Sequence, residues 1–201
     1  MAARARALME SGARPEEVLH ACYGVWFPEE LFAFAELYAE DKEPNTRLVN
    51  RPFNLIVPLD RGGPPAAVDI FDELERRVYQ LDPTLVPLMH VYGDFYEHGG
   101  TMVSYRLSDL AEGRSTIWGL QGDLLDDAAV ATRLGDSLGE VLRADAADRL
   151  QHLEAEWASP YNYGAGSLDK CELDEGRENL AACEELIRRT AERRRPRLVR
   201  P

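Results

Sequence analysis

The sequence predicts an α+β fold, in which a small, mostly antiparallel sheet is covered by helices and followed by a C-terminal helical extension. Two observations carry this prediction. Residues 85–120 hold most of the strand signal, as three short apolar runs separated by two polar turns. On both sides of this stretch, apolar residues recur at the 3.6-residue period of an amphipathic helix.

The central strands are expected at 85–92, 101–107 and 115–120. The second alternates apolar and polar residues, so one of its faces is expected on the core and the other is expected to be more exposed. A fourth strand is expected at 54–59, between two prolines. Pro87 predicts either an edge position or a bulge for the first central strand.

Helices are expected around these strands, at 2–11, 15–24, 28–41, 69–81, 136–157 and 169–195. The best marked begins at Pro28 and has Glu29 and Glu30 in its first turn. Acids in a first turn favour the positive end of the helix dipole, so we interpret both glutamates as dipole partners.

The expected organisation is an α+β domain at 1–158, a linker plus C-terminal helix at 159–195, and a basic tail at 196–201. The end of the last helix reads RRTAERRRPRLVRP from residue 188 onward. This end is too charged to bury, and we expect it to be frayed or disordered.

Charge is divided unevenly along the chain. Residues 188–201 carry seven arginines against one glutamate, a charge of +6, so the first 187 residues carry −19 of the total of −13. A body this acidic repels nucleic acid and anionic membranes and suits a basic protein partner. The simpler interpretation is that the charge serves solubility alone.

Composition and motifs further restrict the class of protein to which the chain can belong. No apolar run is long enough to span a bilayer, and none near the N-terminus has signal-peptide length, so a cytoplasmic location is expected. The three cysteines are too scattered for a disulfide framework or a zinc knuckle, so all are expected to be reduced. GxSxG, CxxC, HExxH and GxGxxG motifs are all absent.

The glycine-rich tip HVYGDFYEHGG gathers His90, Asp94, Glu97 and His98. On a helix, His90, Asp94 and His98 would share one face and could bind a metal. The glycines and aromatics indicate strand and turn instead, which spreads these side chains apart. We therefore expect no metal and no cofactor, and either a polar rim that binds a partner or an ordinary turn.

Two stretches carry a family resemblance. In GVWFPEELFAFAELYAE, an apolar lead-in, a proline and two acids precede an aromatic helix. LVPLMHVYGDFYEHGGTMVSYRLSDLAEGRSTIWGL follows later and leads to DSLGEVLRA. In this order they resemble the SUKH superfamily, a domain named for yeast regulators of cell-wall synthesis and widespread in bacteria. The match covers about residues 23–145; segment 41–83 is longer than the family pattern, and 146–195 is additional.

Many bacterial members of that superfamily are immunity proteins that neutralise a toxin, often a nuclease or a deaminase. The resemblance implies a SUKH-like domain that binds without catalysis and covers the active site of a partner such as a basic toxin. The contact surface would be the 93–100 tip and the 108–114 loop. The residues expected to contact the partner are Asp94, Tyr96, Glu97, His98, Asp109, Glu112 and Arg114.

A weaker similarity is to the histone PARylation factor family, whose "FP..f..F..f" opening is similar to the segment from Phe27 to Phe34. That family's later "lvGPyd" stretch is not found as such in this sequence; LIVPLD, at 55–60, is only loosely similar to it.

The leading hypothesis is a non-catalytic, cytoplasmic protein-binding module, present as a monomer or weak homodimer. One alternative is a small-molecule or metal-dependent enzyme that uses the 90–98 turn. Another is a structural or regulatory protein that associates through its C-terminal helix.

Overall fold

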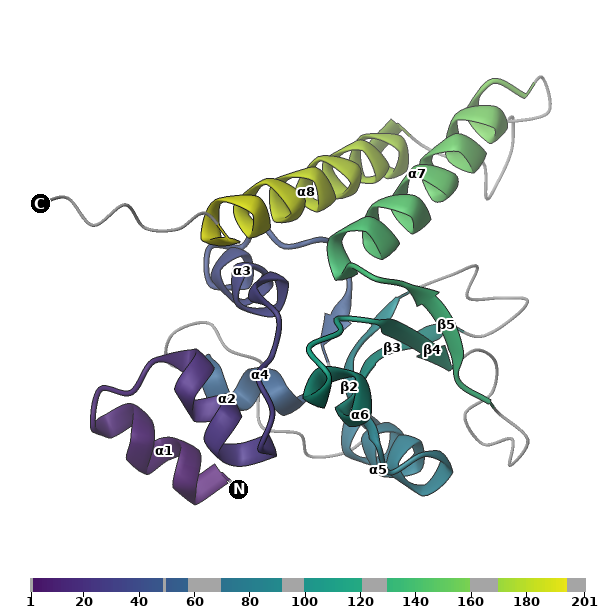
Figure 1. Ribbon diagram of the computed structural model, residues 1–201. Helices are drawn as coiled ribbons and strands as arrows, with labels where there is room; N and C mark the ends of the chain where they lie inside the picture. Colours follow the sequence, from purple (N-terminus) through teal and green to yellow (C-terminus); the bar gives the residue numbers. More distant parts are fainter. Residues whose placement is uncertain are drawn as a thin grey trace, which may run out of the picture.

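The computed structural model describes residues 2–48, 50–57, 70–91, 100–120, 130–159 and 170–194. Within them the chain has the expected α+β fold, with one antiparallel sheet and helices packed around it (Figure 1).

The sheet is a five-stranded meander in the order β1-β2-β3-β4-β5, and every neighbouring pair is antiparallel. Its strands are β1 (Arg47–Leu48), β2 (Leu85–Val91), β3 (Thr101–Arg106), β4 (Ile117–Leu120) and β5 (Thr132–Gly135). The three central strands confirm the prediction. The edge strands β1 and β5 are not predicted, because strands of two and four residues are too short to show a hydrophobic pattern.

The helices are α1 (Ala2–Glu10), α2 (Pro15–Tyr23), α3 (Glu29–Tyr38), α4 (Asn50–Ile56), α5 (Ile70–Leu81), α6 (Leu107–Ala111), α7 (Leu138–Trp157) and α8 (Lys170–Arg194). Local chemistry sets several of their ends. Gly24 ends α2 in the left-handed conformation, with φ 77°, and its N–H donates to His20 O at 2.8 Å. The Ser137 side chain caps α7 by accepting from Glu140 N.

Both faces of the sheet are buried. Val103 and Tyr105 face the large core, to which most of the helices contribute. Met102 faces the other way, where Val78 of α5 covers it. Ser104 is also buried. The expectation that one face of β3 is more exposed is therefore wrong, because a period of two shows that a strand has two different faces but not what covers each.

Pro87 lies at an irregularity in β2. The register with β3 shifts between Pro87 and Met89, which leaves Leu88 as the extra residue. Of the two roles expected for Pro87, the bulge is confirmed.

The strand expected at 54–59 is wrong. Residues 50–56 form α4, and 58–59 lie outside the described residues. Phe53 and Ile56 are buried at a spacing of three, which suits a helix. Pro52 is tolerated because first-turn amides lack an intrahelical partner. A six-residue apolar run does not distinguish strand from helix by its pattern.

The C-terminal helix α8 packs along α7 and α3 (Figure 1). Its Cys183 and Leu186 belong to the same core cluster as the sheet. A Cβ placed on Gly139 of α7 would lie 2.8 Å from Ile187 Cγ1, so this glycine permits the close approach. The frayed end expected from residue 188 onward is wrong as far as Arg194, and the tail 196–201 lies outside the described residues.

Candidate functional site

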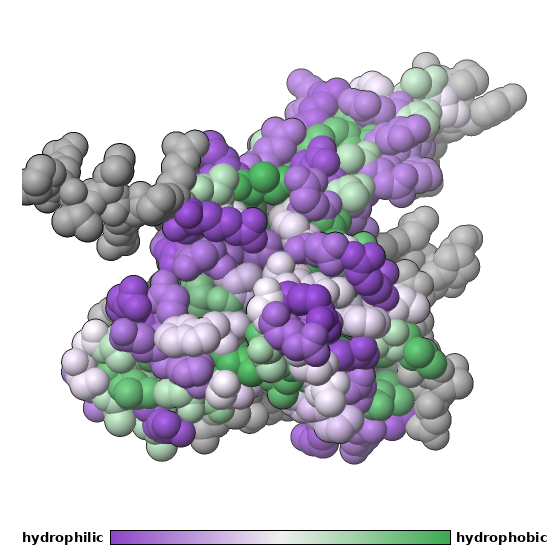
Figure 2. All heavy atoms as spheres, viewed as in Figure 1, coloured by the Kyte–Doolittle hydropathy of each residue, from purple (hydrophilic) through white to green (hydrophobic). Residues whose placement is uncertain are grey.

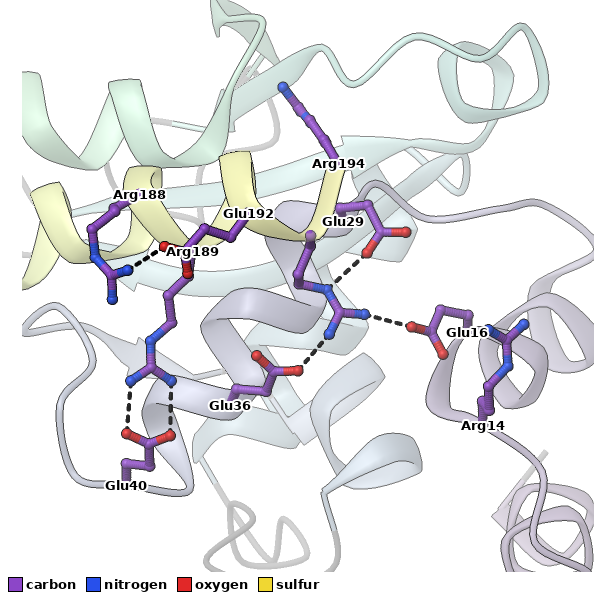
Figure 3. A pocket seen from close by; sticks show the side chains of 10 residues that line it. Arg14, Glu16, Glu29, Glu36, Glu40, Arg188, Arg189, Glu192 and Arg194 are labelled. Atoms are coloured by element: carbon purple, nitrogen blue, oxygen red, sulfur yellow. Dashed lines mark hydrogen bonds and ion pairs between the residues drawn. The ribbon is translucent and has the colours of Figure 1, made fainter. Parts of the chain in front are cut away.

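Three carboxylates from two helices surround the guanidinium of Arg193, near the end of α8. Its Nε donates to Glu29 Oε2 at 2.7 Å, and its Nη2 donates to Glu16 Oε1 at 2.5 Å. Its Nη1 donates to Glu36, and Figure 3 shows the three glutamates converging. The Arg193 side chain is 22% exposed, and one positive charge here meets three negative ones.

Arg189, one turn earlier, makes a second contact of the same kind. Its two terminal nitrogens each donate to one oxygen of Glu40, both at 2.8 Å, and Figure 3 shows this parallel pair. Its Nε also donates to Glu185 at 2.9 Å. Two parallel bonds of this kind fix orientation as well as distance, because the guanidinium fork matches a carboxylate. We call Arg189 and Arg193 the arginine clasp.

The acids opposite the clasp are named here the carboxylate cluster: Glu16, Glu29, Glu36 and Glu40. Glu29 and Glu36 lie two turns apart on α3, and Glu40 follows its end, so helical spacing keeps them on one side. The dipole role expected for Glu29 is thus incomplete, since its carboxylate also binds α8. The recurrence of acids at 29, 36 and 40 and of arginines at 189 and 193 is the signal in the sequence that could have revealed the contact.

These charged groups line a cavity of about 820 Å³. Its lining consists of five arginines and five glutamates: Arg14, Arg188, Arg189, Arg193, Arg194, Glu16, Glu29, Glu36, Glu40 and Glu192. Figure 2 shows hydrophilic side chains over the region where the C-terminal end of α8 meets α3, with an apolar patch directly below.

An apolar groove adjoins this cavity and has a volume of about 360 Å³. The two share Arg14, Glu16, Glu36 and Arg193 at their common rim. The apolar groove is lined by Phe32, Ala35, Ala39, Ile56 and Val57, together with Pro15. Apolar walls with a few charged groups at the rim are typical of a site that binds a side chain or a small ligand.

Acid should weaken the clasp. A hydrogen bond from Arg189, followed by one from Lys42, lowers the pKa of Glu40 to about 2. Because this pKa is lower in the folded chain than in the unfolded one, the contribution is fully present above about pH 4.5 and is lost as the pH falls toward about 2. We expect Glu40→Gln to lower the melting temperature at neutral pH and to flatten its decline on acidification. Melting curves of the two proteins should converge near pH 2; a constant difference down to that pH would contradict the assignment.

Glu30, the neighbour of Glu29, is fully buried and joins three elements. Tyr105 Oη of β3 donates to its Oε1 at 2.8 Å, and Ser137 Oγ donates to its Oε2 at 3.0 Å. Burial, with the Glu30 carboxylate as the next cause, raises the pKa of Tyr105 well above its ordinary range. The group has no solvent access, so its role is to hold α3, the sheet and α7 together. The sequence predicts Glu30 only as a partner of the helix dipole and does not predict that it joins these three elements.

The segment 108–114, expected as a loop, is helical over 108–111, where it belongs to α6. Its predicted contact residues fall into two kinds. Asp109 is 6% exposed and accepts from Trp118 Nε1 at 2.7 Å and from Arg114 Nη2 at 2.6 Å. Burial is the largest single influence and would raise the pKa of Asp109, but these two bonds and the positive charges of Arg114 and Arg106 together lower the pKa. Glu112 and Arg114 are exposed and pair with each other. Asp109 thus stabilises this segment through internal hydrogen bonds, whereas Glu112 and Arg114 expose their charges to solvent.

The two strand ends that flank the tip lie at the opposite end of β3 from this segment. Asp94, Tyr96, Glu97 and His98 are outside the described residues. The register nevertheless places Val91 opposite Thr101 at one end of the β2–β3 pair and Leu85 opposite Arg106 at the other. Five residue steps separate these ends, which is roughly 17 Å along the strand. The structure therefore does not bring the root of the tip and the 108–114 loop together.

Two observations concern metal-binding and nucleophilic groups in the part of the chain that the structure describes. No group of three or more His, Cys, Asp or Glu there could hold a metal ion. Burial raises the pKa of Cys183 to about 12, which removes it as a nucleophile at neutral pH. All three cysteines are free, as expected from their spacing.

Comparisons with known proteins add no assignment: no family model, no curated protein and no solved structure matches the chain. Among the described helices, none has the length and apolar character needed to cross a membrane.

Proposed function

We propose that the chain is a non-catalytic, cytoplasmic protein-binding module that captures a basic protein and covers its functional site. The observation that carries the proposal is the carboxylate cluster, where acids from α2 and α3 hold guanidinium groups on one side of the molecule. Within the chain, these acids already bind two arginines, Arg189 and Arg193.

Charge distribution supports the same proposal. The first 187 residues carry −19, which attracts a basic partner over long range and raises its association rate. The resemblance of 23–145 to the SUKH superfamily agrees with it, because immunity proteins of that superfamily bind toxins by occlusion. A toxin directed at nucleic acid would supply the basic surface.

The neighbouring genes supply the test. We expect one of their products to form a stoichiometric complex with this chain in size-exclusion chromatography with light scattering. Titration calorimetry should show an affinity that falls as salt is raised, because the contact is charged. Absence of a complex with every neighbouring product would overturn the proposal.

Two double variants of equal charge change locate the surface. Glu29→Gln with Glu36→Gln alters the carboxylate cluster, whereas Glu178→Gln with Glu184→Gln alters exposed acids of α8. We expect the first pair to weaken the complex at least tenfold and the second to leave it nearly unchanged. Equal effects would mean that the partner responds to net charge alone.

The two alternative functions rest on other segments. An enzyme that uses the 90–98 turn depends on Asp94, Glu97 and His98, which lie outside the described residues. Association through the C-terminal helix needs an exposed apolar face. In α8, however, Leu173, Cys183 and Leu186 are buried within the chain, and no large hydrophobic residue of this helix is exposed. The burial of these apolar residues therefore argues against association through the C-terminal helix.

A further inference from the structure

We propose that the apolar groove docks a cationic amphipathic helix of the partner, and that the arginine clasp of α8 occupies the charged half of this surface in cis. The partner helix would carry two arginines four residues apart, with an apolar side chain beside them. This inference names the partner chemistry of the proposed binding module and rests on that function for its biological role.

The chain itself shows which ligand the charged half accepts. Arg189 and Arg193 are four residues apart on α8, so both point to one side of that helix and reach carboxylates of α2 and α3. The paired bonds to Glu40 use the planar fork of arginine, which lysine does not have. A foreign helix with the same spacing would meet the same four acids.

The apolar half explains why a helix fits and not an isolated cation. Ala35 of α3 and Ala39, the C-cap of that helix, lie one turn apart and present small side chains to the groove. Small residues at this spacing let a second helix approach closely, while the buried side chains of Phe32, Ile56 and Val57 form an apolar floor. An amphipathic helix that lays its apolar face into such a groove is a common mode of recognition.

Charge complementarity decides the sign of the partner. Glu16 and Glu36 belong to the rim of the groove, and with Glu29 they give Arg193 three negative neighbours. The cavity lining is balanced, with five arginines and five glutamates, while the clasp is in place; without Arg189 and Arg193, five glutamates face three arginines. That excess of carboxylate disfavours an anionic peptide, a nucleic acid or an anionic lipid surface. A guanidinium from outside relieves the repulsion among these acids.

The position of the clasp makes it displaceable. Arg189 and Arg193 lie in the last two turns of α8, beyond Cys183 and Leu186, which anchor the helix in the core; among residues 188–194 only Thr190 is buried. The end of a helix opens more readily than its middle, because the last carbonyls have no intrahelical donor. A partner can therefore replace the two arginines while the rest of α8 stays packed.

The test uses a fluorescent, alanine-based helical peptide with one Arg-Ala-Ala-Ala-Arg pair and a leucine one turn away. Fluorescence anisotropy measures its binding to the full chain. We expect Arg189→Gln with Arg193→Gln to bind the peptide at least tenfold more tightly than the native chain, because the internal competitor is gone. Arg177→Gln is the matched control: Arg177 lies on the same helix outside both linings and pairs with Asp174 and Glu154, so affinity should stay unchanged.

Two further comparisons place the peptide on the proposed surface. Adding Glu36→Gln and Glu40→Gln to the double variant should abolish the gain, and Ala35→Trp, which fills the groove, should weaken binding at least tenfold. Circular dichroism checks that each variant is folded. If the double arginine variant does not fold, Arg189→Lys with Arg193→Lys keeps the charge, loses the fork and should bind about threefold more tightly than the native chain.

Peptide affinity that does not rise when the clasp is removed, or that does not depend on Glu36 and Glu40, overturns the inference. The outcome is independent of the neighbouring-gene experiment. Peptide binding without a neighbouring partner would remove the proposed function and keep the surface. If a neighbouring gene product binds the chain but substitution of the arginine clasp changes no affinity, the proposed function stands and the docking surface is removed.

Discussion

Leu186→Ala in α8 is expected to lower the free energy of unfolding by about 3 kcal/mol, because a fully buried leucine is replaced in a core shared by α8 and the sheet. Urea denaturation at neutral pH measures the change. Leu180→Ala is the matched control, since Leu180 lies on the same helix and is only partly buried. It should cost less than half as much.

The comparison asks whether α8 is part of the folding unit. If α8 were only attached to a complete domain, Leu186→Ala would leave the main unfolding transition unchanged and would alter helix content alone. Equal costs for the two leucine variants would likewise contradict the packing described above.

Glu30→Ala is expected to destabilise the chain by about 3 kcal/mol. The substitution removes the acceptor of two hydroxyl groups and leaves the fully buried Tyr105 Oη without its partner. Glu30→Gln should cost less, about 1–2 kcal/mol, because the amide oxygen can still accept one of the two bonds. Thermal and urea unfolding of both variants check the order.

Glu140→Ala is the control for helix position, since Glu140 also lies in the first turn of a helix but is exposed and pairs with Arg143. It should cost less than 1 kcal/mol, as exposed pairs do. A similar cost for Glu30→Ala and Glu140→Ala would mean that Glu30 acts only on the dipole of α3.

Two adjacent residues in the first turn of α3, Glu29 and Glu30, have different roles. Glu29 points to Arg193 at the surface, whereas Glu30 points into the core. The surface acid is available to a partner that competes with α8, and the buried acid is not. Substitutions at residue 29 should therefore act on binding, and those at residue 30 on folding.

Pattern alone was sufficient for much of the architecture. The caps and periodicity predict α2, α3, α7 and α8 close to their observed bounds, because a proline, a glycine or a serine marks an end locally. The central strands follow from their short apolar runs. The error at α4 has the same physical basis, since a short apolar run between prolines suits either element.

The candidate site depended on contacts that no local pattern contains. Glu16 and Arg193 are far apart in the chain and meet only because α8 crosses α3 beside the start of α2. The sequence shows an acidic body and a basic end, and the spacing of acids at 29, 36 and 40 and of arginines at 189 and 193 suits one side of a helix in each case. Tertiary packing decided that the arginines of α8 pair with the acids of α2 and α3. The buried apolar faces fix where each helix lies, and surface guanidinium and carboxylate groups then pair with the opposite charges that come within hydrogen-bond distance.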